Sequence, residues 1–465
     1  MTAVTTDESG ITEAELEPVI GLEIHAQLLT MSKMFCGCSA HYADAEPNTH
    51  VCAVCVGMPG ALPVINSKAV EFTVMTARAL HCRVDPTSKF DRKNYQYPDL
   101  PKGYQISQYD LPIGQDGWLD FAAGDATRRC GIVRVHLEED TGKTSHTTVD
   151  GRDVSLVDYN RSGLPLMEIV SRPDLRSPEE AAEYFAALRQ LLMYLGVSDG
   201  NLQEGSMRAD VNVSVRRAGG ELGTKVEIKN LNSFRAVQRA LRFEIERQSR
   251  IIEASGQVEH ETRGWSEERQ ITVSQRSKEY AQDYRYFPEP DLPALTFSEE
   301  RVETIETSMP ELPAERRDRL ATEYGLSRDI ATVITAERLR ADFFERAARS
   351  ASSVSATTVA HWLTGPIMGL LNESNLRVED SLLQPEALGQ LLTMVESGSV
   401  SGTAARTSVL PEMVRTGDPP DVIVTRLGLE RIGDKAAIDA LVDQVLAAND
   451  GMVAQYRAGK TQVLQ

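Results

Sequence analysis

Four cysteines near the N-terminus form two closely spaced pairs. Cys36 and Cys38 are separated by one residue, and Cys52 and Cys55 follow after a 13-residue gap as a Cys-x-x-Cys pair. Two such pairs, each on its own turn, can present four sulfurs to one tetrahedral ion, as structural zinc sites do. The alternative is a set of free buried thiols. Because four protein ligands leave no open position on the metal, we expect a structural rather than a catalytic zinc.

Carboxylates and an imidazole form the second candidate site. Glu23 and His25 are two residues apart in a segment with the pattern of a β-strand, so they point to the same face. Glu138 and Glu168 lie in two further segments with apolar residues behind them. Together the four residues would suit magnesium, whereas each taken singly could be a surface or salt-bridged group. Glu168 lies within an apolar run, where a buried charge needs a partner or an ion.

Strands of alternating polarity must position these residues. Three segments, beginning near residues 132, 207 and 225, alternate apolar and polar residues with the period of two that is typical of strands. Their polar sides carry both signs of charge. These sides could simply face solvent, but the mixture of charges favours a concave sheet that holds a ligand. In the first segment the apolar side comprises Val133, Val135 and Leu137, and the polar side comprises Arg134, His136 and Glu138.

Helices are expected between the strands, and they dominate the last third of the chain. Ser177 and Pro178 are a typical N-cap and first-turn pair, and the helix that they begin should end at Gly196. A second long helix should run from Ser233 to about Ser255.

Composition and spacing predict four parts along the chain. We expect a disordered acidic leader over residues 1–18 and a catalytic domain over residues 19–300, with the zinc-binding segment at residues 36–55. A helical domain over residues 301–412 and a tail domain over residues 413–465 should follow.

Charge and hydropathy exclude several classes of protein. The net charge of −19 argues against a general nucleic-acid coat, because phosphate binding depends on Lys and Arg. A local basic surface is still compatible with the sequence, and residues 89–97 interleave basic and aromatic side chains, although they could equally form a solvated loop. No apolar run is long enough to cross a membrane, and the acidic first 18 residues do not resemble a signal or transit peptide. We therefore expect a cytoplasmic protein with reduced cysteines.

A nucleotide site of the common kinds is absent from the sequence. There is neither a P-loop nor a Gly-x-Gly-x-x-Gly turn after a strand. Any nucleotide would therefore be held by carboxylate-bound magnesium together with scattered basic side chains. The candidates for this role are Lys89, Arg92, Lys93, Lys143, Arg161 and Arg208.

Six stretches carry a resemblance to a known family. They are Val19-Ile-Gly-Leu-Glu-Ile-His25, Lys89-Phe-Asp-Arg-Lys-Asn-Tyr95 with Tyr97-Pro-Asp99, His136-Leu-Glu-Glu-Asp-Thr-Gly-Lys143, Val157-Asp-Tyr-Asn-Arg-Ser-Gly-Leu-Pro-Leu-Met-Glu-Ile-Val170, Lys225-Val-Glu-Ile-Lys-Asn-Leu-Asn-Ser-Phe234 and Asp283-Tyr-Arg-Tyr-Phe-Pro-Glu-Pro-Asp291. In this order they resemble the B subunit of the tRNA-dependent amidotransferase that acts on misacylated glutamyl- and aspartyl-tRNA. They span nearly the whole of the first 290 residues, and the resemblance continues more weakly beyond them.

The resemblance implies both a fold and a reaction. The fold would be α+β, with a cradle-shaped, largely antiparallel-sheet catalytic domain related to glutamine synthetase, a helical domain and a small α-helical tail that contacts tRNA. The reaction would be the phosphorylation by ATP of the side-chain carboxylate of Glu-tRNA(Gln) or Asp-tRNA(Asn), followed by amidation. The ammonia would come from glutamine hydrolysed on the A subunit, and the C subunit would complete a heterotrimer.

The family's functional residues can be transferred to matching positions of this sequence. By resemblance, the magnesium ligands are Glu23, His25, Glu138 and Glu168, the same residues that the strand pattern selects. We further expect phosphate or acyl-adenosine to contact Lys89, Lys93, Arg161 and Arg208. The four cysteines resemble those of the zinc-bearing members, and other members lack them, so zinc would not be needed for the chemistry.

Two other functions are compatible with the sequence, and the chain differs from the family in one respect. The chain could be a non-catalytic, zinc-bearing RNA-binding scaffold, or a free-standing ligase, similar to glutamine synthetase, that acts on small carboxylates. The family usually continues with further helical structure beyond the position of Lys460, so we expect the tail domain to be incomplete and tRNA affinity to be affected.

Overall fold

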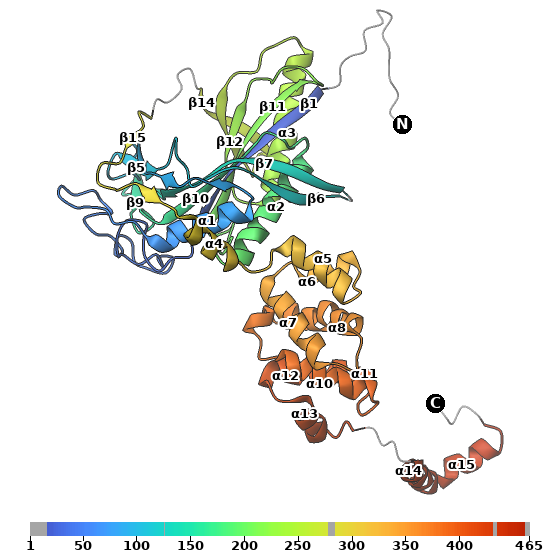
Figure 1. Cartoon of the computed structure of the whole chain (residues 1–465). Helices are drawn as coiled ribbons and strands as arrows, with labels where there is room; N and C mark the ends of the chain where they lie inside the picture. The colour runs from blue at the N-terminus through green and yellow to red at the C-terminus, as the bar shows by residue number, and fades with distance from the viewer. Residues whose placement is uncertain (1–15, 125, 278–283, 431–434, 461–465) are drawn as a thin grey trace, which may run out of the picture. The chain divides into compact units, whose positions relative to one another are not determined.

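The protein is described by a computed structural model that covers residues 16–124, 126–277, 284–430 and 435–460. It divides between Leu312 and Pro313 into two compact units, the first α+β and the second helical (Figure 1). The expected α+β class is therefore confirmed. The strands are β1 Leu16–Gln27, β2 Arg83–Val84, β3 Thr87–Ser88, β4 Asp91–Asn94, β5 Tyr104–Ser107, β6 Gly114–Ala123, β7 Ala126–Glu139, β8 Lys143–Val149, β9 Arg152–Asp158, β10 Pro165–Ser171, β11 Met207–Arg217, β12 Val226–Leu231, β13 Glu261–Ser266, β14 Ile271–Ser277, β15 Phe287–Pro288 and β16 Leu295–Thr296.

Helices occur in both units. Those of the first unit are α1 Ser67–Ala79, α2 Pro178–Leu195, α3 Phe234–Glu253 and α4 Glu299–Thr307. Those of the second are α5 Pro313–Glu323, α6 Arg328–Ile334, α7 Arg338–Ser350, α8 Ala356–Trp362, the π-helix η1 Leu363–Ile367, α9 Met368–Glu373, the 3-10 helix η2 Val378–Asp380, α10 Pro385–Glu396, α11 Gly402–Ala404, the π-helix η3 Ala405–Val409, α12 Leu410–Thr416, α13 Pro420–Leu427, α14 Lys435–Ala448 and α15 Asp450–Arg457.

One large sheet organises the first unit. Among the described residues, nine strands form it in the order β14-β13-β12-β11-β1-β10-β7-β6-β2, and every neighbouring pair is antiparallel except β12 and β13. Ile20, Leu22 and Ile24 on the central strand β1 are buried on one face against a core that includes residues of α1, α2 and α3 (Figure 1). Because side chains alternate along a strand, Glu23 and His25 lie on the opposite, polar face.

Strands β7, β11 and β12 confirm the three strands predicted from alternation, but one residue was placed on the wrong face. Val135 and Leu137 are fully buried, as expected, whereas Val133 is 36% exposed. The pairing of β10 with β7 shifts register next to this position, so that Val170 is opposite Arg134 and Ser171 is opposite Ile132. The irregularity adds one residue to β7, which turns Val133 out of the core.

The two predicted helices of the first unit are confirmed, and so are the two caps predicted for the first of them. The Ser177 hydroxyl accepts a hydrogen bond from the Glu180 amide at 3.1 Å, so it satisfies one of the free N–H groups at the start of α2. Gly196 follows the helix with a φ of 69°, a left-handed conformation that glycine adopts without steric cost. Helix α3 begins after its N-cap Ser233, as predicted.

The helical unit has its own core. It contains residues from α5 to α13, among them Phe344, Leu388, Met413 and Ile423. Residues 413–424, which sequence analysis assigns to the tail domain, thus contribute to this core. Residues 1–15 of the predicted leader, and residues 431–434 and 461–465 of the predicted tail, lie outside the described part of the chain. In that part, no helix is both long and apolar enough to cross a membrane.

A buried ion-pair network links α5 to α7 in the helical unit. The side chain of Glu345, which is only 10% exposed, accepts hydrogen bonds from Arg316 and lies 2.8 Å from Arg319 Nη1. Burial acts to raise the pKa of Glu345, but the hydrogen bonds and charges of Arg319 and Arg316 outweigh it and lower the pKa below its usual value. The carboxylate is therefore more stable in the folded than in the unfolded state.

We expect Glu345→Gln to destabilise the helical unit by about 2 kcal/mol at pH 7, because a charge-assisted hydrogen-bonded partner of two arginines is lost. Since the folded pKa is depressed, the contribution of Glu345 is complete above its unfolded pKa of about 4.3 and disappears as the pH falls further. Urea denaturation of both proteins between pH 7 and pH 3.5 measures this convergence. The control Glu323→Gln removes an exposed partner of Arg319 and should change stability by less than about 0.5 kcal/mol. A pH-independent difference would contradict the prediction.

Candidate functional site

Three ionisable side chains form a row across the centre of the sheet. His25 on β1 is directly opposite Glu168 on β10, and Glu168 is directly opposite His136 on β7. Residues opposite each other on antiparallel strands point to the same face, so the three side chains meet on the polar face. The Nε2 atoms of His25 and His136 each lie 3.4 Å from Oε2 of Glu168. Glu168 is therefore held between two imidazoles.

Glu138 completes the group from the next row of the sheet. Its Oε2 atom lies 3.7 Å from His136 Nε2 and accepts a hydrogen bond from the Ser107 hydroxyl at 3.0 Å. One donor atom from each of His25, Glu138 and Glu168 lies within 4.8 Å of the others. The structure thus brings three of the four predicted magnesium ligands together.

Glu23 lies on the same face but outside this group. It is opposite Val170 on β10, whereas Glu138 is opposite Leu166, so the two glutamates are on opposite sides of the His25–Glu168–His136 row. The Glu23 carboxylate accepts a hydrogen bond from Asn212 Nδ2 at 2.8 Å. Its role as a ligand stays a prediction.

Electrostatics keep the two buried carboxylates anionic. Burial alone would raise the pKa of Glu168, but His136 and His25 lower it well below the usual value. Burial opposes ionisation of Glu138 as well, and its pKa is lowered by the hydrogen bond with His136 and the charge of Lys93. In return, Glu168 raises the pKa of His25 against the effect of burial. The site is therefore a compact anionic centre with compensating cations.

This donor set fits a hard divalent cation. Magnesium is commonly bound by one or two carboxylates, and its other positions are filled by water and substrate phosphates. Glu138 and Glu168 are buried and ionised, and among the described residues the Nδ1 atoms of His25 and His136 are buried without a hydrogen-bond partner. Glu138 and Glu168, with His25 beside them, would hold such an ion.

Two of the four predicted basic residues belong to this neighbourhood. Although burial disfavours the charge of Lys93, the carboxylates of Glu138 and Glu168 raise its pKa. Arg208 is opposite His25 on the neighbouring strand, and its pKa is raised, against the effect of burial, chiefly by Asp140. Both cations thus lie near the anionic centre, and Arg208 Nη2 also lies 3.6 Å from a carboxylate oxygen of Asp140.

The other two predicted basic residues have local partners. Lys89 Nζ lies 2.8 Å from a carboxylate oxygen of both Asp91 and Asp110. Arg161 donates from Nε to the carbonyl of Thr141 at 2.9 Å and from Nη2 to that of Gly142 at 2.7 Å. These contacts fix their positions, and a role in binding phosphate stays a prediction for both.

Sequence reasoning did not select His136 and a group of tyrosines. His136 alternates in phase with Glu138, which was the signal that could have identified it. Lys93 Nζ lies 5.1 Å from the ring centroid of Tyr284, and the rings of Tyr109 and Tyr286 stack at 4.3 Å. Tyr284 and Tyr286 share one segment, but Lys93 and Tyr109 come from others, so no local spacing connects the whole group. Burial raises the pKa of Tyr286 to about 12, so its hydroxyl stays neutral.

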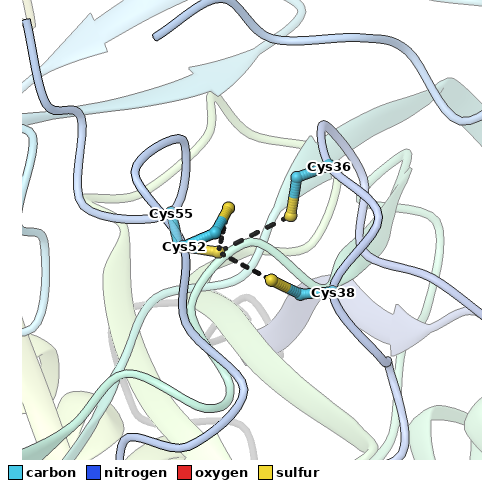
Figure 2. Close-up of side chains that lie close together, drawn as sticks. All are labelled: Cys36, Cys38, Cys52 and Cys55. Carbon is cyan, nitrogen blue, oxygen red and sulfur yellow. Dashed lines mark hydrogen bonds between the residues drawn. The ribbon is translucent and has the colours of Figure 1, made fainter.

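The four N-terminal cysteines converge as predicted (Figure 2). Cys55 Sγ lies 3.6 Å from that of Cys36, 3.7 Å from that of Cys52 and 3.9 Å from that of Cys38. A tetrahedral ion with metal–sulfur bonds of about 2.3 Å would separate its sulfurs by about 3.8 Å. No disulfide joins the described cysteines. The hydrogen bond with Cys36 lowers the pKa of Cys55 to about 4 against the effect of burial. The cluster fits one zinc ion.

Comparison with known proteins covers nearly the whole chain. The sequence model of the GatB/GatE catalytic domain matches residues 18–303, and that of the GatB domain matches residues 342–465. The B subunit of aspartyl/glutamyl-tRNA(Asn/Gln) amidotransferase from Thermomicrobium roseum is 54% identical over 448 residues, which cover 96% of this chain and 92% of that protein. Its counterparts in Moorella thermoacetica and Synechococcus elongatus are 52% and 50% identical, and each alignment covers 97% of this chain and 94% or 92% of the relative.

The first unit, with its polar sheet face, is thus a catalytic domain of the GatB/GatE class. The chain belongs to the family formed by the B subunits of aspartyl/glutamyl-tRNA(Asn/Gln) amidotransferases.

We expect the purified protein to contain about one zinc per chain, because the four sulfurs already lie at the sulfur–sulfur distances that a tetrahedral zinc requires. Replacing Cys38 by Ser should lower the zinc content several-fold and expose the remaining cluster thiols to titration. Elemental analysis and thiol titration measure both effects. Cys130→Ser changes a buried cysteine outside the cluster and should leave the zinc content unchanged. Wild-type protein with no metal and four freely titrating thiols would refute the prediction.

Proposed function

We propose that this chain activates the side-chain carboxylate of misacylated Glu-tRNA(Gln) or Asp-tRNA(Asn) with ATP and amidates it with ammonia. The strongest support is the convergence of His25, Glu138 and Glu168 on the polar face of the sheet. That face lies in a chain related along nearly its whole length to the B subunit of an amidotransferase. A ligase that forms a carbon–nitrogen bond needs a site that brings two anions together, and this donor set suits that task.

The chemistry explains why phosphorylation comes first. A carboxylate is a poor acyl donor, because its leaving group would be oxide. In the proposed first step a carboxylate oxygen attacks the γ-phosphorus of ATP, the bond to ADP breaks, and an acyl phosphate forms. Ammonia then attacks the carbonyl carbon, phosphate leaves, and the nitrogen loses a proton to give the amide. The first step brings two anions into contact and the second releases an anionic phosphate, so both are helped by concentrated positive charge.

In this proposal, different residues of the polar face bind the metal, orient its carboxylate ligands and attract the phosphate. A magnesium ion held at this site would supply positive charge that lowers the repulsion between the carboxylate and the phosphates. Glu138 and Glu168 would hold it, while Ser107 and His136 fix the orientation of the two carboxylates. Lys93 would attract the transferred phosphate from the same side.

The remaining parts of the proposal concern partners. Ammonia would be released from glutamine on the A subunit and delivered to this site, the C subunit would join both chains, and the heterotrimer would work in the cytoplasm. A structural zinc at the four cysteines would not take part in the reaction. The tRNA would bind a local basic surface, since a chain with a net charge of −19 repels RNA elsewhere.

Replacing Glu138 by Gln should reduce amidation by at least about 100-fold, because the change removes one anionic ligand without altering volume. The assay uses the chain reconstituted with the A and C subunits, Glu-tRNA(Gln), ATP and glutamine, and it measures Gln-tRNA and glutamate release separately. Glutamine hydrolysis on the A subunit should persist. The control Glu179→Gln changes a glutamate on α2 that pairs with Arg242 at the surface, and amidation should be retained.

The outcomes of this assay separate the alternatives. Undiminished amidation by the Glu138→Gln complex would favour a non-catalytic, zinc-bearing RNA-binding scaffold. Amidation of free glutamate in the absence of tRNA would favour a free-standing ligase for small carboxylates.

Binding of misacylated tRNA should weaken at least about tenfold between 50 and 200 mM salt, because contacts with phosphates release counterions. Fluorescence anisotropy of labelled tRNA with the reconstituted complex measures this dependence. A flat response would contradict the local basic surface.

A further inference from the structure

Lys33 is one of the most deeply buried charged residues of the described chain, with 1% of its surface exposed. It lies three residues before Cys36, in the segment that follows β1. Its backbone amide donates to the carbonyl of Cys38 at 2.9 Å, and the next amide, of Met34, donates to the carbonyl of Gly163 at 2.7 Å. The residue therefore lies between the cysteine cluster and the loop that precedes β10.

The Lys33 amine has three hydrogen-bond acceptors. Its Nζ atom donates to the carbonyl of Ser162 at 2.6 Å, to the carbonyl of Tyr159 at 3.2 Å and to Cys55 Sγ at 3.6 Å. Only the charged ammonium form has three N–H groups to satisfy all three. A buried ammonium needs a compensating negative charge. Among the described ionic contacts, no carboxylate lies within 4.0 Å of Lys33, and the acceptor in contact with its ammonium that can carry negative charge is the Cys55 sulfur.

The metal centre supplies that charge. Four thiolates around one Zn²⁺ carry a net charge of two minus, which is itself costly in a partly buried position. Lys33 contacts the sulfur of Cys55, the cysteine that lies within 3.9 Å of the other three sulfurs. With the Lys33 ammonium included, the assembly would carry a net charge of one minus, and an N–H···S hydrogen bond at this atom would disfavour dissociation of the thiolate.

The loop on the other side of Lys33 is bound to the cysteine segment at further points. Asn48, which lies between the two cysteine pairs, accepts a hydrogen bond from the Tyr159 amide at 2.8 Å. The His50 amide donates to Asn160 Oδ1, and Asn160 Nδ2 donates to the carbonyl of Glu46, both at 2.8 Å. The same loop carries Arg161, whose guanidinium Nε lies 3.8 Å from a carboxylate oxygen of Asp140.

We infer that Lys33 is a positioning residue that neutralises part of the metal–thiolate charge and ties the centre to the loop at residues 159–163. The metal would then be required for the order of this loop, which leads into β10 and Glu168. The inference rests on the metal centre of the proposed function, but it does not depend on the amidation reaction.

The test compares zinc affinity in full-length wild type, Lys33→Met, Lys33→Arg and Lys102→Met. Methionine keeps the approximate volume of the side chain but removes its charge, so we expect the zinc Kd to rise about 10- to 100-fold in competition with a chromophoric chelator. Lys33→Arg keeps the charge and should recover most of this loss. Lys102, only 6% exposed, pairs with Glu139 instead of a thiolate, so its replacement should leave the Kd within about threefold of wild type.

Two spectroscopic measurements separate this role from a purely structural one. In the Co²⁺-loaded protein, loss of the N–H···S hydrogen bond in Lys33→Met should shift the sulfur-to-metal charge-transfer bands, whereas Lys102→Met should not shift them. In the wild type, removing the metal should accelerate hydrogen exchange of amides 159–163. This second measurement requires no variant, so it remains decisive if Lys33→Met fails to fold.

Each contrary result has a distinct meaning. An unchanged Kd and unchanged cobalt spectrum in Lys33→Met, or unchanged exchange of the loop after metal removal, would overturn the inference alone. A wild-type chain that binds no zinc would overturn the metal centre together with the inference. Neither result would affect the amidation proposal, which is judged by the Glu138→Gln assay.

Discussion

The polar face of the large sheet depends on the burial of one negative charge between two imidazoles. Glu168 lies on β10, which pairs with β1 on one side and with β7 on the other, so its carboxylate receives His25 and His136 from the two neighbours. A buried carboxylate without such partners would take up a proton or destabilise the fold. The ionisation of the site therefore depends on the register of three strands, because a shift of any one of them by one residue would move its side chain to the apolar face.

Much of this arrangement could be predicted from the sequence, because alternation and capping are local signals. The period of two identified the strand that carries Glu138, and an apolar run indicated the strand that carries Glu168. The residues around α2 carried a typical N-cap and C-cap at Ser177 and Gly196. The spacing of the two cysteine pairs predicted that their four sulfurs would converge, since each pair lies on one short turn. Resemblance to the family selected the same ligands as the strand pattern, and three of them, including His25, do meet.

The rest could not be predicted, because it depends on contacts between segments far apart in the sequence. The irregular pairing that exposes Val133 depends on how β7 meets β10, and it leaves no mark on the alternation of β7 itself. The pairing of the Lys89 ammonium with Asp91 and Asp110 is one example, because Asp110 comes from a separate segment of the chain. Lys33 had no distinguishing neighbour in the sequence, and only the fold brings its ammonium to a sulfur.

The position of β1 has a consequence for biosynthesis. This strand is made first but lies inside the sheet, and both of its partners, β10 and β11, come much later in the chain. Its last pairing, of Leu16 with Arg217, can form only after β11 has left the ribosome. At ordinary rates of translation the nascent chain presents an unpaired apolar strand for on the order of 10 to 40 s. Until β10 and β11 pair with it, such an exposed edge is a template for association with other chains.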